Sequence, residues 1–284
     1  MTAGAVHAIS TLLDMADAFD VAVLDQWGVL HDGTVAYPGA PEAVARLRAT
    51  GKAVVVLSNS GKRADVNAER IRTMGVRVDT KEVVTSGEAL WRDVQRGRLP
   101  PFARPFAVTG RKGDAERWAN GLDTRFTDDL GSADALLLMG LPEGAERRDY
   151  ADLLDAAHER DLPLVCSNPD RNSPRAGGGS ALQPGTLAHD YAARDGTVHW
   201  YGKPHAPVFR AVERLNPGVP ATRHVMVGDS VEHDVAGGAA AGWRTCLVRG
   251  GLHADELDGS DALVRALCER HQAPVPDAHI AMLA

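Results

Sequence analysis

The sequence predicts an α/β protein in which a domain built on a parallel sheet is interrupted by a second α/β domain. Short runs of Val, Ile and Leu alternate with helical patterns, which is typical of parallel α/β architecture. The alternation restarts at about Thr85, and the first pattern resumes after Tyr201. We therefore expect one domain from residues 1–84 plus 200–284 and an inserted domain from residues 85–199. The 284 residues, 44% of them hydrophobic, are enough for two domains with apolar cores.

The first domain is expected to alternate strands and helices along the chain. The helix from about Arg63 to Met74 illustrates the pattern, because Ala64, Ala68 and Ile71 share one face and Gly75 ends it. The strands are expected at Val21–Leu24, Ala53–Leu57, Val83–Val84, His224–Val227 and Thr245–Val248. The other helices are expected at Pro41–Thr50, Pro204–Leu215 and Val231–Ala241.

The inserted domain repeats this alternation on a smaller scale. Its strands are expected at Pro105–Thr109, Ala135–Met139 and Leu162–Ser167. Its helices are expected at Asp114–Asn120, Arg147–Arg160 and Leu187–Arg194. The same order of elements in both blocks predicts a second α/β unit rather than an extension of the first.

Net charge and cysteine usage exclude several classes of partner. The formal net charge is −7, from 31 basic and 38 acidic residues, and no long Lys/Arg run is present, so neither nucleic acid nor an anionic membrane is expected to bind. The apolar runs are of strand length and too short to cross a bilayer. Cys166, Cys246 and Cys268 are isolated and lack CxxC spacing, which disfavours a disulfide framework or a zinc site and favours a reduced, cytoplasmic setting.

Unusual polar residues stand where three of the predicted strands end. Asp25 follows the first strand, Ser58 and Asn59 follow the second, and Asp229 follows a strand in the last third of the chain. In open parallel sheets, ligands bind beyond the carboxyl ends of the strands. We therefore expect these side chains to share one site.

The residue types at this site predict phosphoryl chemistry with a divalent metal. Two or three carboxylates can hold one hard cation, and Mg²⁺ takes one or two of them together with phosphate oxygens of a substrate. Asp234, five residues after Asp229, adds a further carboxylate. Lys203, in a Gly-Lys-Pro segment that opens a helix, and the Ser58 hydroxyl can donate to a phosphate. Asp25 can attack phosphorus and form an aspartyl-phosphate.

The ordered set of motifs resembles the haloacid dehalogenase (HAD) superfamily of hydrolases, class IIA, whose members carry a large α/β cap of the C2 type. The motifs D-Q-W-G-V-L, S-N-S, G-K-P and G-D-S-V-E-H-D stand in family order. Y-P-G-A at Tyr37–Ala40 and S-N-P-D at Ser167–Asp170 agree with the branch that includes sugar-phosphate, nitrophenyl-phosphate and pyridoxal-phosphate phosphatases. The resemblance covers nearly the whole chain and implies a Rossmann-like core domain interrupted by the cap domain.

The resemblance also implies a role for each motif residue. Asp25 would be the nucleophile and, with Asp229 and the backbone carbonyl of Trp27, a ligand of Mg²⁺. Asp234 would steady the metal site or Lys203, and Lys203 would assist catalysis at the phosphoryl group. The residues that bind phosphate or substrate would be Ser58, Asn59 and Lys203 in the core motifs and Asn168 and Asp170 in the cap motif.

One position departs from the phosphatase pattern. Phosphatases of this superfamily carry a second Asp, a general acid and base, two positions after the nucleophile, and Trp27 stands there instead. An indole cannot donate a useful proton to a leaving alkoxide. Three interpretations are open: His31 or Asp32 replaces the missing group, the substrate has an activated leaving group, or Trp27 packs in the core beneath the cap.

These observations predict an Mg²⁺-dependent phosphatase of a small phosphorylated metabolite, such as a sugar phosphate, acting through an aspartyl-phosphate on Asp25. One alternative is a related hydrolase of an activated bond, such as an acyl phosphate, enol phosphate or phosphonate. The other is a catalytically weak metabolite-binding protein, against which the intact nucleophile and metal carboxylates argue. Relatives commonly dimerise through their caps, but no exposed apolar stripe demands this here, so a homodimer also stays open.

Overall fold

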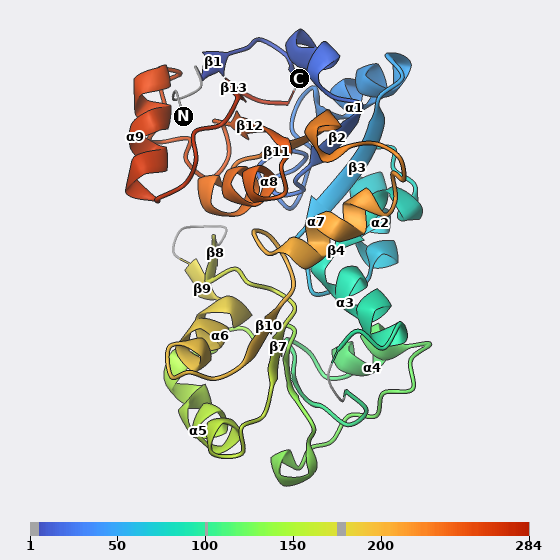
Figure 1. Ribbon diagram of the computed structural model, residues 1–284, viewed down its shortest axis with the longest axis vertical. Coiled ribbons are helices and arrows are strands. Elements are labelled where there is room, and N and C mark those ends of the chain that lie inside the picture. Colours follow the sequence, from blue (N-terminus) through green and yellow to red (C-terminus); the bar gives the residue numbers. More distant parts are fainter. Residues whose placement is uncertain (1–5, 100–101, 175–179, 284) are drawn as a thin grey trace. The chain divides into compact units, whose positions relative to one another are not determined.

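The computed structural model describes residues 6–99, 102–174 and 180–283, and the chain divides into two compact units (Figure 1). Unit 1 consists of residues 1–58, 64–84 and 203–284, and unit 2 of residues 59–63 and 85–202. Both units combine helices with sheets of parallel strands, so the predicted fold class is confirmed. In the described part of the chain, no helix combines the length and apolarity that a membrane span requires.

Unit 1 is built on a seven-stranded sheet with the order β1-β13-β12-β11-β2-β3-β4. Its strands are β1 (His7–Ala8), β2 (Val21–Leu24), β3 (Ala53–Ser58), β4 (Val83–Thr85), β11 (His224–Gly228), β12 (Arg244–Val248) and β13 (Ala278–Ile280). β2 pairs in parallel with both β3 and β11, with Leu24 opposite Val56 on one side and Val227 on the other. The carboxyl ends of these three strands therefore meet at one edge of the sheet.

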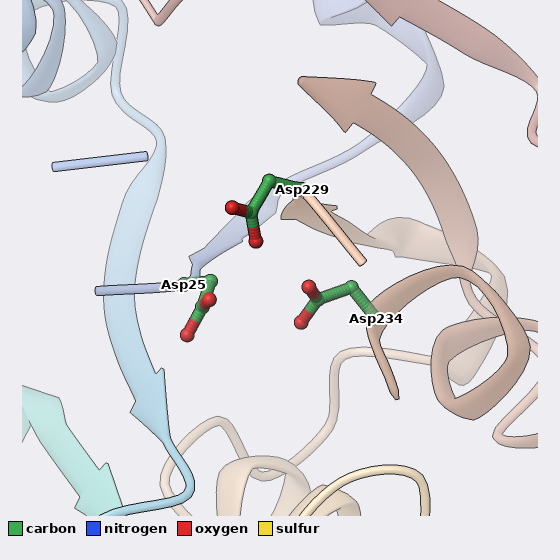
Figure 2. Close-up of side chains that lie close together, drawn as sticks. All are labelled: Asp25, Asp229 and Asp234. Atoms are coloured by element: carbon green, nitrogen blue, oxygen red, sulfur yellow. The ribbon is translucent and has the colours of Figure 1, made fainter. Parts of the chain in front are cut away.

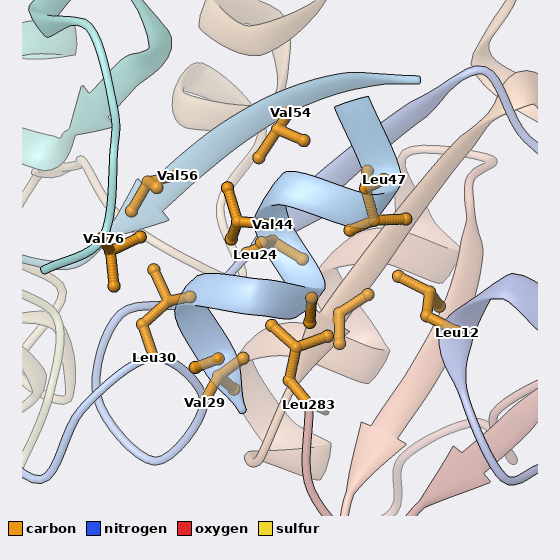
Figure 3. Close-up of a cluster of buried hydrophobic side chains, with 14 of the residues drawn as sticks. Leu12, Leu24, Val29, Leu30, Val44, Leu47, Val54, Val56, Val76 and Leu283 are labelled. Atoms are coloured by element: carbon orange, nitrogen blue, oxygen red, sulfur yellow. The ribbon is translucent and has the colours of Figure 1, made fainter. Parts of the chain in front are cut away.

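Helices cover both faces of this sheet. The helices of unit 1 are α1 (Ala40–Ala49), α2 (Ala64–Thr73), α7 (Ala206–Glu213), α8 (Ala236–Ala240) and α9 (Asp261–Arg270). Along β12, Cys246 and Val248 join the larger core cluster with α1 and α2, part of which Figure 3 shows. Leu247, between them, joins a second cluster with Val264 and Leu267 of α9. Successive strand residues point to opposite faces, so the two clusters lie on opposite sides of the sheet.

Unit 2 contains a four-stranded parallel sheet with the order β10-β7-β6-β5. Its strands are β5 (Phe106–Val108), β6 (Leu136–Leu138), β7 (Leu164–Cys166) and β10 (Val198–Trp200), and a separate antiparallel hairpin comprises β8 (Asn172–Pro174) and β9 (Ser180–Leu182). Its helices are α3 (Ser86–Gln95), α4 (Asp114–Ala119), α5 (Ala151–Glu159) and α6 (Pro184–Ala192). Leu136, Leu138 and Leu164 of the sheet pack with Leu154 and Leu187 of the helices in one buried cluster.

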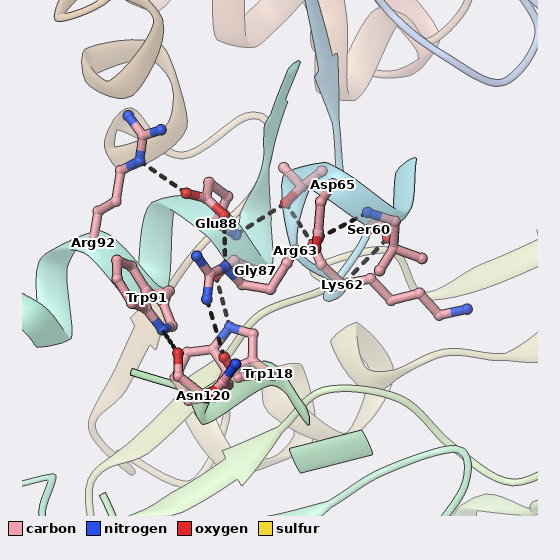
Figure 4. Close-up of polar contacts among 12 residues, drawn as sticks. Ser60, Lys62, Arg63, Asp65, Gly87, Glu88, Trp91, Arg92, Trp118 and Asn120 are labelled. Carbon is pink, nitrogen blue, oxygen red and sulfur yellow. Dashed lines mark hydrogen bonds and ion pairs between the residues drawn. The ribbon is translucent and has the colours of Figure 1, made fainter. Parts of the chain in front are cut away.

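Polar contacts tie the short segment 59–63 to unit 2, as Figure 4 shows. Arg63 Nε donates to Glu88 Oε2 at 2.6 Å, and its guanidinium carbon lies 3.9 Å from the centroid of the Trp91 ring. Trp118 Nε1 donates to the Gly87 carbonyl at 2.7 Å, which joins α4 to α3. These contacts explain why five residues that precede α2 belong to the second unit.

Two predicted helices of unit 1 differ from their expected form. The segment expected as one helix from Val231 to Ala241 begins with a π-helical turn, Val231–Val235, before α8. The helix expected to begin at Pro204 begins at Ala206, with His205 as its N-cap. The π-helical turn contains the predicted site residue Asp234, and the later helix start lies close to the predicted site residue Lys203.

Candidate active site

Adjacent strands of the unit 1 sheet bring two of the predicted carboxylates together. Asp25 directly follows β2, and its amide donates to the Val227 carbonyl of β11 at 2.9 Å. Asp229 directly follows β11. Since β2 and β11 run parallel, both side chains emerge at the same edge of the sheet. One oxygen of each, with one of Asp234, forms a group whose atoms all lie within 4.8 Å of one another (Figure 2).

A buried lysine lies between two of these carboxylates. Lys203 Nζ is 2.6 Å from Asp25 Oδ1 and 2.7 Å from Asp234 Oδ1, and its side chain is only 3% exposed. Burial by itself lowers the pKa of Lys203, but the carboxylates of Asp234 and Asp25 outweigh burial and raise the pKa above its usual value. The site therefore holds a permanent positive charge beside the predicted nucleophile.

The π-helical turn places Asp234 in this cluster. The amides of Asp234 and Val235 both donate to the Ser230 carbonyl, at 3.0 and 3.2 Å, and the second of these is the longer bond of a π turn. Asp234 Oδ2 in turn accepts from the Ser230 amide at 3.1 Å. A Cβ on Gly228 would overlap the Asp234 carboxylate, so the end of β11 needs glycine at this position. Asp234 is thus oriented toward Lys203 by its own backbone.

Burial, together with the excess of carboxylates over the single ammonium, raises the pKa values of Asp25 and Asp229. Burial raises the pKa of Asp25 well above its usual value; Lys203 opposes this effect, and Asp234 and Asp229 add to it. Burial and the charge of Asp234 raise the pKa of Asp229 to about 7, against the Leu252 amide and Lys203. Three carboxylates, two of them buried and that of Asp25 largely so, leave with one ammonium an excess of negative charge that a cation would offset.

Backbone segments close around Asp229 on two sides. Gly28, at φ +75°, lies so near that a Cβ there would overlap Asp229 Oδ2, and a Cβ on Gly251 would do the same. The Leu252 amide donates to Asp229 Oδ2 at 2.8 Å. Gly28 belongs to the first motif, whereas Gly251 and Leu252 were not predicted, although the glycine pair that follows β12 at positions 250–251 is a readable signal. The all-oxygen donor set and this close backbone fit a small, hard cation.

The second motif is divided between the two units. Ser58 ends β3 and is buried in unit 1, at the edge of the sheet where β2 also ends. Asn59 belongs to unit 2, where its Nδ2 donates to Asp170 Oδ1 at 2.7 Å. Asn168 donates from Nδ2 to Gln183 Oε1 at 3.2 Å and accepts the Asp170 amide at 3.1 Å. The structure thus brings Asn59, Asn168 and Asp170 together within unit 2, and their contacts with a substrate stay a prediction.

Trp27 lies in the loop that follows Asp25, and the interpretation that it packs beneath the cap stays a prediction. The residue is 46% exposed, and isolated backbone bridges join His31 to Trp27 and to Ala36 within its loop. The His31 ring makes an edge contact with the Trp27 ring, with centroids 5.7 Å apart, and the Arg70 guanidinium carbon lies 5.9 Å from the Trp27 centroid. The carbonyl of Trp27 precedes Gly28 at the Asp229 site, and its role as a metal ligand stays a prediction.

Both predicted substitutes for the missing acid make hydrogen bonds within the loop that follows Asp25, and their role in proton transfer stays a prediction. His31 is buried, its Nδ1 accepts the Gly33 amide at 2.9 Å, and burial and the charge of Arg70 lower its pKa to about 4, so the ring is neutral near pH 7. Asp32 Oδ1 accepts the Thr34 amide, the Thr34 hydroxyl and the Val35 amide at 2.8, 3.0 and 2.9 Å, and these bonds lower its pKa. Asp32 therefore stabilises a turn.

Comparison with known proteins agrees with this geometry. The sequence model of the family described as haloacid dehalogenase-like hydrolase matches residues 22–120, and a related HAD-hydrolase-like model matches residues 200–269. Chronophin from Homo sapiens is 30% identical over 253 residues, which cover 86% of this chain and 85% of chronophin. Glycerol-3-phosphate phosphatase from Gallus gallus is 29% identical and covers 93% of this chain and 90% of its own length.

Solved structures show the same relationship. The p-nitrophenyl phosphatase from Archaeoglobus fulgidus aligns with a TM-score of 0.76 and 26% identity, covering 93% of this chain and 97% of that protein. A haloacid dehalogenase-like hydrolase from Brucella suis aligns with a TM-score of 0.79 and 28% identity, covering 97% and 100%. Because chronophin matches most of both chains at 30% identity, this chain belongs to the haloacid dehalogenase-like hydrolases, the family that its motifs predicted.

Proposed function

We propose that the protein is an Mg²⁺-dependent phosphatase that hydrolyses a small phosphorylated metabolite. The observation that carries this proposal is the Lys203 ammonium held at 2.6 Å from Asp25 and 2.7 Å from Asp234, with Asp229 in the same cluster. A carboxylate nucleophile, a fixed cation and an excess of negative charge meet at the end of a parallel sheet, where ligands of this architecture bind.

Asp25 and Asp229, with the carbonyl of Trp27, would hold the metal ion. When bound, Mg²⁺ supplies positive charge that stabilises the transferring phosphoryl group. The donor set supports this choice of ion, since every side-chain ligand is a carboxylate and no cysteine or histidine joins the cluster among the described residues. Asp234 would not be needed as a ligand, because its carboxylate already receives Lys203 and the Ser230 amide.

The chain's own residues would perform the transfer in two steps. A carboxylate oxygen of Asp25 attacks phosphorus, the ester P–O bond breaks with its electron pair on the departing oxygen, and an aspartyl-phosphate forms while the alcohol leaves with a proton taken from water. Water then attacks that phosphorus, the bond to Asp25 breaks, and inorganic phosphate leaves. Lys203 and the Ser58 hydroxyl would bind the phosphoryl oxygens in both steps. Because these donors are already in place before the reaction, little free energy is needed to reorient them in the transition state.

The names of the relatives support a small phosphate monoester as the substrate. The relatives include a glycerol-3-phosphate phosphatase, a sugar-phosphatase from Bacillus subtilis and a p-nitrophenyl phosphatase. We also propose a cytoplasmic location, because all three cysteines are free thiols buried in the fold. A homodimer is the assembly that we would test first, by light scattering.

The experiment that tests the function is a phosphate-release screen over a panel of phosphorylated metabolites, with and without Mg²⁺. We expect release that needs both the metal and Asp25, so the Asp25→Asn variant is the matched negative control. Release by wild type that persists after chelation, or that survives in Asp25→Asn, would contradict the proposed mechanism.

A further inference from the structure

The loop that follows β12 contacts one carboxylate of the predicted metal site. Within this loop, the Leu252 amide donates to Asp229 Oδ2 at 2.8 Å, and a Cβ on Gly251 would overlap the same carboxylate. His253 comes directly after Leu252 and is buried. Its Nδ1 lies 3.1 Å from Glu256 Oε1, and Nδ1 therefore carries the proton, because an ionised carboxylate can only accept. The backbone that contacts Asp229 thus continues into a buried histidine.

The π-helical turn is a second segment of the site, and it carries a glutamate that reaches α9. The turn orients Asp234, and Glu232 lies in the same turn, two residues earlier. Glu232 Oε2 is 3.4 Å from Nδ1 of His271, which is the C-cap residue of α9. The end of α9 therefore contacts the segment from which the Asp234 carboxylate emerges.

Two histidines meet at the end of α9 and link these two segments. The rings of His253 and His271 make an edge contact, with centroids 5.5 Å apart. Arg270, beside His271, donates to the Glu256 carboxylate of the loop that follows β12. Both segments of the metal site are therefore joined through the end of α9. We call His253 and His271 together the histidine pair.

An apolar cluster joins the same three segments. It contains Val231 and Val235 of the π-helical turn, Leu257 of the loop that follows β12, and Leu267 and Cys268 of α9. Buried side chains are close-packed and leave few voids, so a packed cluster transmits a displacement instead of absorbing it. A shift at the end of α9 should therefore reach both segments that surround the carboxylates.

We propose that the histidine pair positions both segments for metal binding and so sets the affinity of the site for Mg²⁺. The inference rests on the proposed function, since it takes Asp229 as a ligand of the ion. Groups that hold a metal ligand in place raise metal affinity, because the ligand has lost its freedom before the ion binds. His253 acts through Leu252 and His271 acts through Glu232, so both are positioning residues.

The end of α9 should respond to the ion in turn. Coupling between two sites is reciprocal, so Mg²⁺ must stabilise the contacts of the histidine pair if the pair strengthens Mg²⁺ binding. In the wild type, added Mg²⁺ should therefore slow hydrogen exchange of the Leu252 amide and of the amides in the last turn of α9. In His271→Ala, the slowing should be confined to Leu252.

The main test is calorimetric titration of Mg²⁺ at about pH 8, where an ordinary histidine carries no charge. We expect His271→Ala to weaken binding by about 3- to 10-fold, less than the roughly 10- to 100-fold loss for a group bonded directly to a metal ligand. His253→Ala should have an effect of similar size. The double variant should lose less than the product of the two single losses, because the two rings share one contact.

Conservative variants and kinetics separate positioning from a general loss of stability. The asparagine side chain offers an N–H close to the place of Nδ1, so His253→Asn and His271→Asn should recover most of the affinity. With 4-nitrophenyl phosphate as the probe, the alanine variants should need more Mg²⁺ for half-maximal rate and reach a similar kcat at saturating Mg²⁺. The control is His7→Ala, which removes an exposed histidine of β1 in the same unit and should leave Mg²⁺ affinity unchanged.

Unchanged Mg²⁺ affinity in both alanine variants, or equal losses in His271→Ala and His271→Asn, would overturn the proposal. If His253→Ala does not fold, the two variants of His271, whose side chain is 27% exposed, decide the test. A wild type that binds Mg²⁺ but releases no phosphate from any metabolite would overturn the proposed function, and the same titrations would still decide the role of the histidine pair. A wild type that binds no Mg²⁺ would overturn both.

Discussion

Each unit of this protein contains a buried cluster of charged side chains, and the two clusters are built in opposite proportions. In unit 2, the Glu88 carboxylate accepts Arg63 Nε at 2.6 Å and Arg92 Nε at 3.0 Å (Figure 4). In unit 1, three carboxylates share the single ammonium of Lys203. The first cluster has two cations for one anion, and the second has three anions for one cation.

The ratio of charges decides what each cluster can do. Burial raises the pKa of Glu88, but the hydrogen bonds and charges of Arg63 and then Arg92 outweigh it, so the pKa is lowered and the ionised form is favoured. In unit 1 the pKa values of Asp25 and Asp229 are raised, so their ionised forms are disfavoured by the fold. A carboxylate that is paired with enough cations stabilises the structure. Carboxylates in excess of the cations beside them form a site whose negative charge a bound cation can offset.

The largest expected effect is on turnover in Asp25→Asn. An amide cannot attack phosphorus, so phosphate release should be abolished. We also expect an effect on stability, because the metal-free fold disfavours the ionised form of Asp25. Near pH 8, the Asp25→Asn variant should therefore unfold at the same or a higher denaturant concentration than the wild type. Asp17→Asn, at an exposed position, should change neither quantity. A folded Asp25→Asn protein with substantial turnover would rule out Asp25 as nucleophile.

A smaller loss is expected when the single cation of the unit 1 cluster is removed. Lys203→Met should lower kcat/KM by about 10²-fold, comparable to the loss of one preorganised electrostatic donor. Vanadate, a phosphate analogue, should inhibit the variant more weakly than the wild type. The control is Lys81→Met, whose side chain is 81% exposed in unit 1. Equal vanadate inhibition of Lys203→Met and wild type would show that Lys203 does not contact the phosphoryl group.

The unit 2 cluster is expected to affect stability instead of chemistry. Glu88→Gln leaves Arg63 and Arg92 without their shared carboxylate, and the free energy of unfolding should fall by about 1–3 kcal/mol, a value reduced for the partial exposure of both arginines. Asp155→Asn removes the exposed ion pair with Arg194 in the same unit and should cost less than about 0.5 kcal/mol. Denaturant unfolding compares them, and equal effects would mean that the buried network contributes no more than a surface pair.

The last expected effects are on pH dependence, where the stability contributions of the two clusters should change with pH in opposite directions. The pKa of Asp229 is raised in the fold to about 7, so the metal-free protein should lose stability as pH rises from about 4 to 7. Mg²⁺ requires the ionised carboxylate, so its apparent affinity should rise over the same range, by up to about tenfold per pH unit. The lowered pKa of Glu88 gives the opposite slope, since its contribution is lost as pH falls through its folded pKa.

Titration of Mg²⁺ by calorimetry at about pH 6 and about pH 8 checks this prediction. In Asp229→Asn, both the pH dependence of affinity and the affinity itself should decrease, because the titrating carboxylate is also a predicted ligand. An affinity that does not change with pH in the wild type would place the ion elsewhere.

Much of the fold could be predicted from local patterns. β2 has the bounds that its buried apolar run predicted, and α1 and α2 end within two residues of their expected glycine stops. α9 was missed although Ser260 caps it and Val264, Leu267 and Cys268 are buried on one face. The pairing of β1 with β13 could not be predicted, because two- and three-residue strands from opposite chain ends carry almost no periodic signal.

The site residues that follow strands could be predicted from the sequence, whereas the conformations and contacts of the site loops could not. Asp25 and Asp229 follow buried strands, and the pairing of those strands brings them together. Asp234 was named from its spacing after Asp229, but the π-helical turn that orients its carboxylate was not predicted. The partner of Asn59 is Asp170, far along the chain, and this contact follows from tertiary structure alone. The exposure of Trp27 has the same origin, since it depends on how its loop folds.

The order of strands in unit 1 has a consequence for synthesis of the chain. β2, which leads to Asp25, has β11 as one of its neighbours, and β11 leaves the ribosome only after all of unit 2 has been made. Residues 85–202, by contrast, form nearly the whole of unit 2 in one continuous stretch. Since domains fold as units and local contacts form first, the inserted unit should become protease-resistant on a nascent chain stalled when residue 202 has just left the ribosome. The segment that carries the nucleophile should still be open to cleavage at that length.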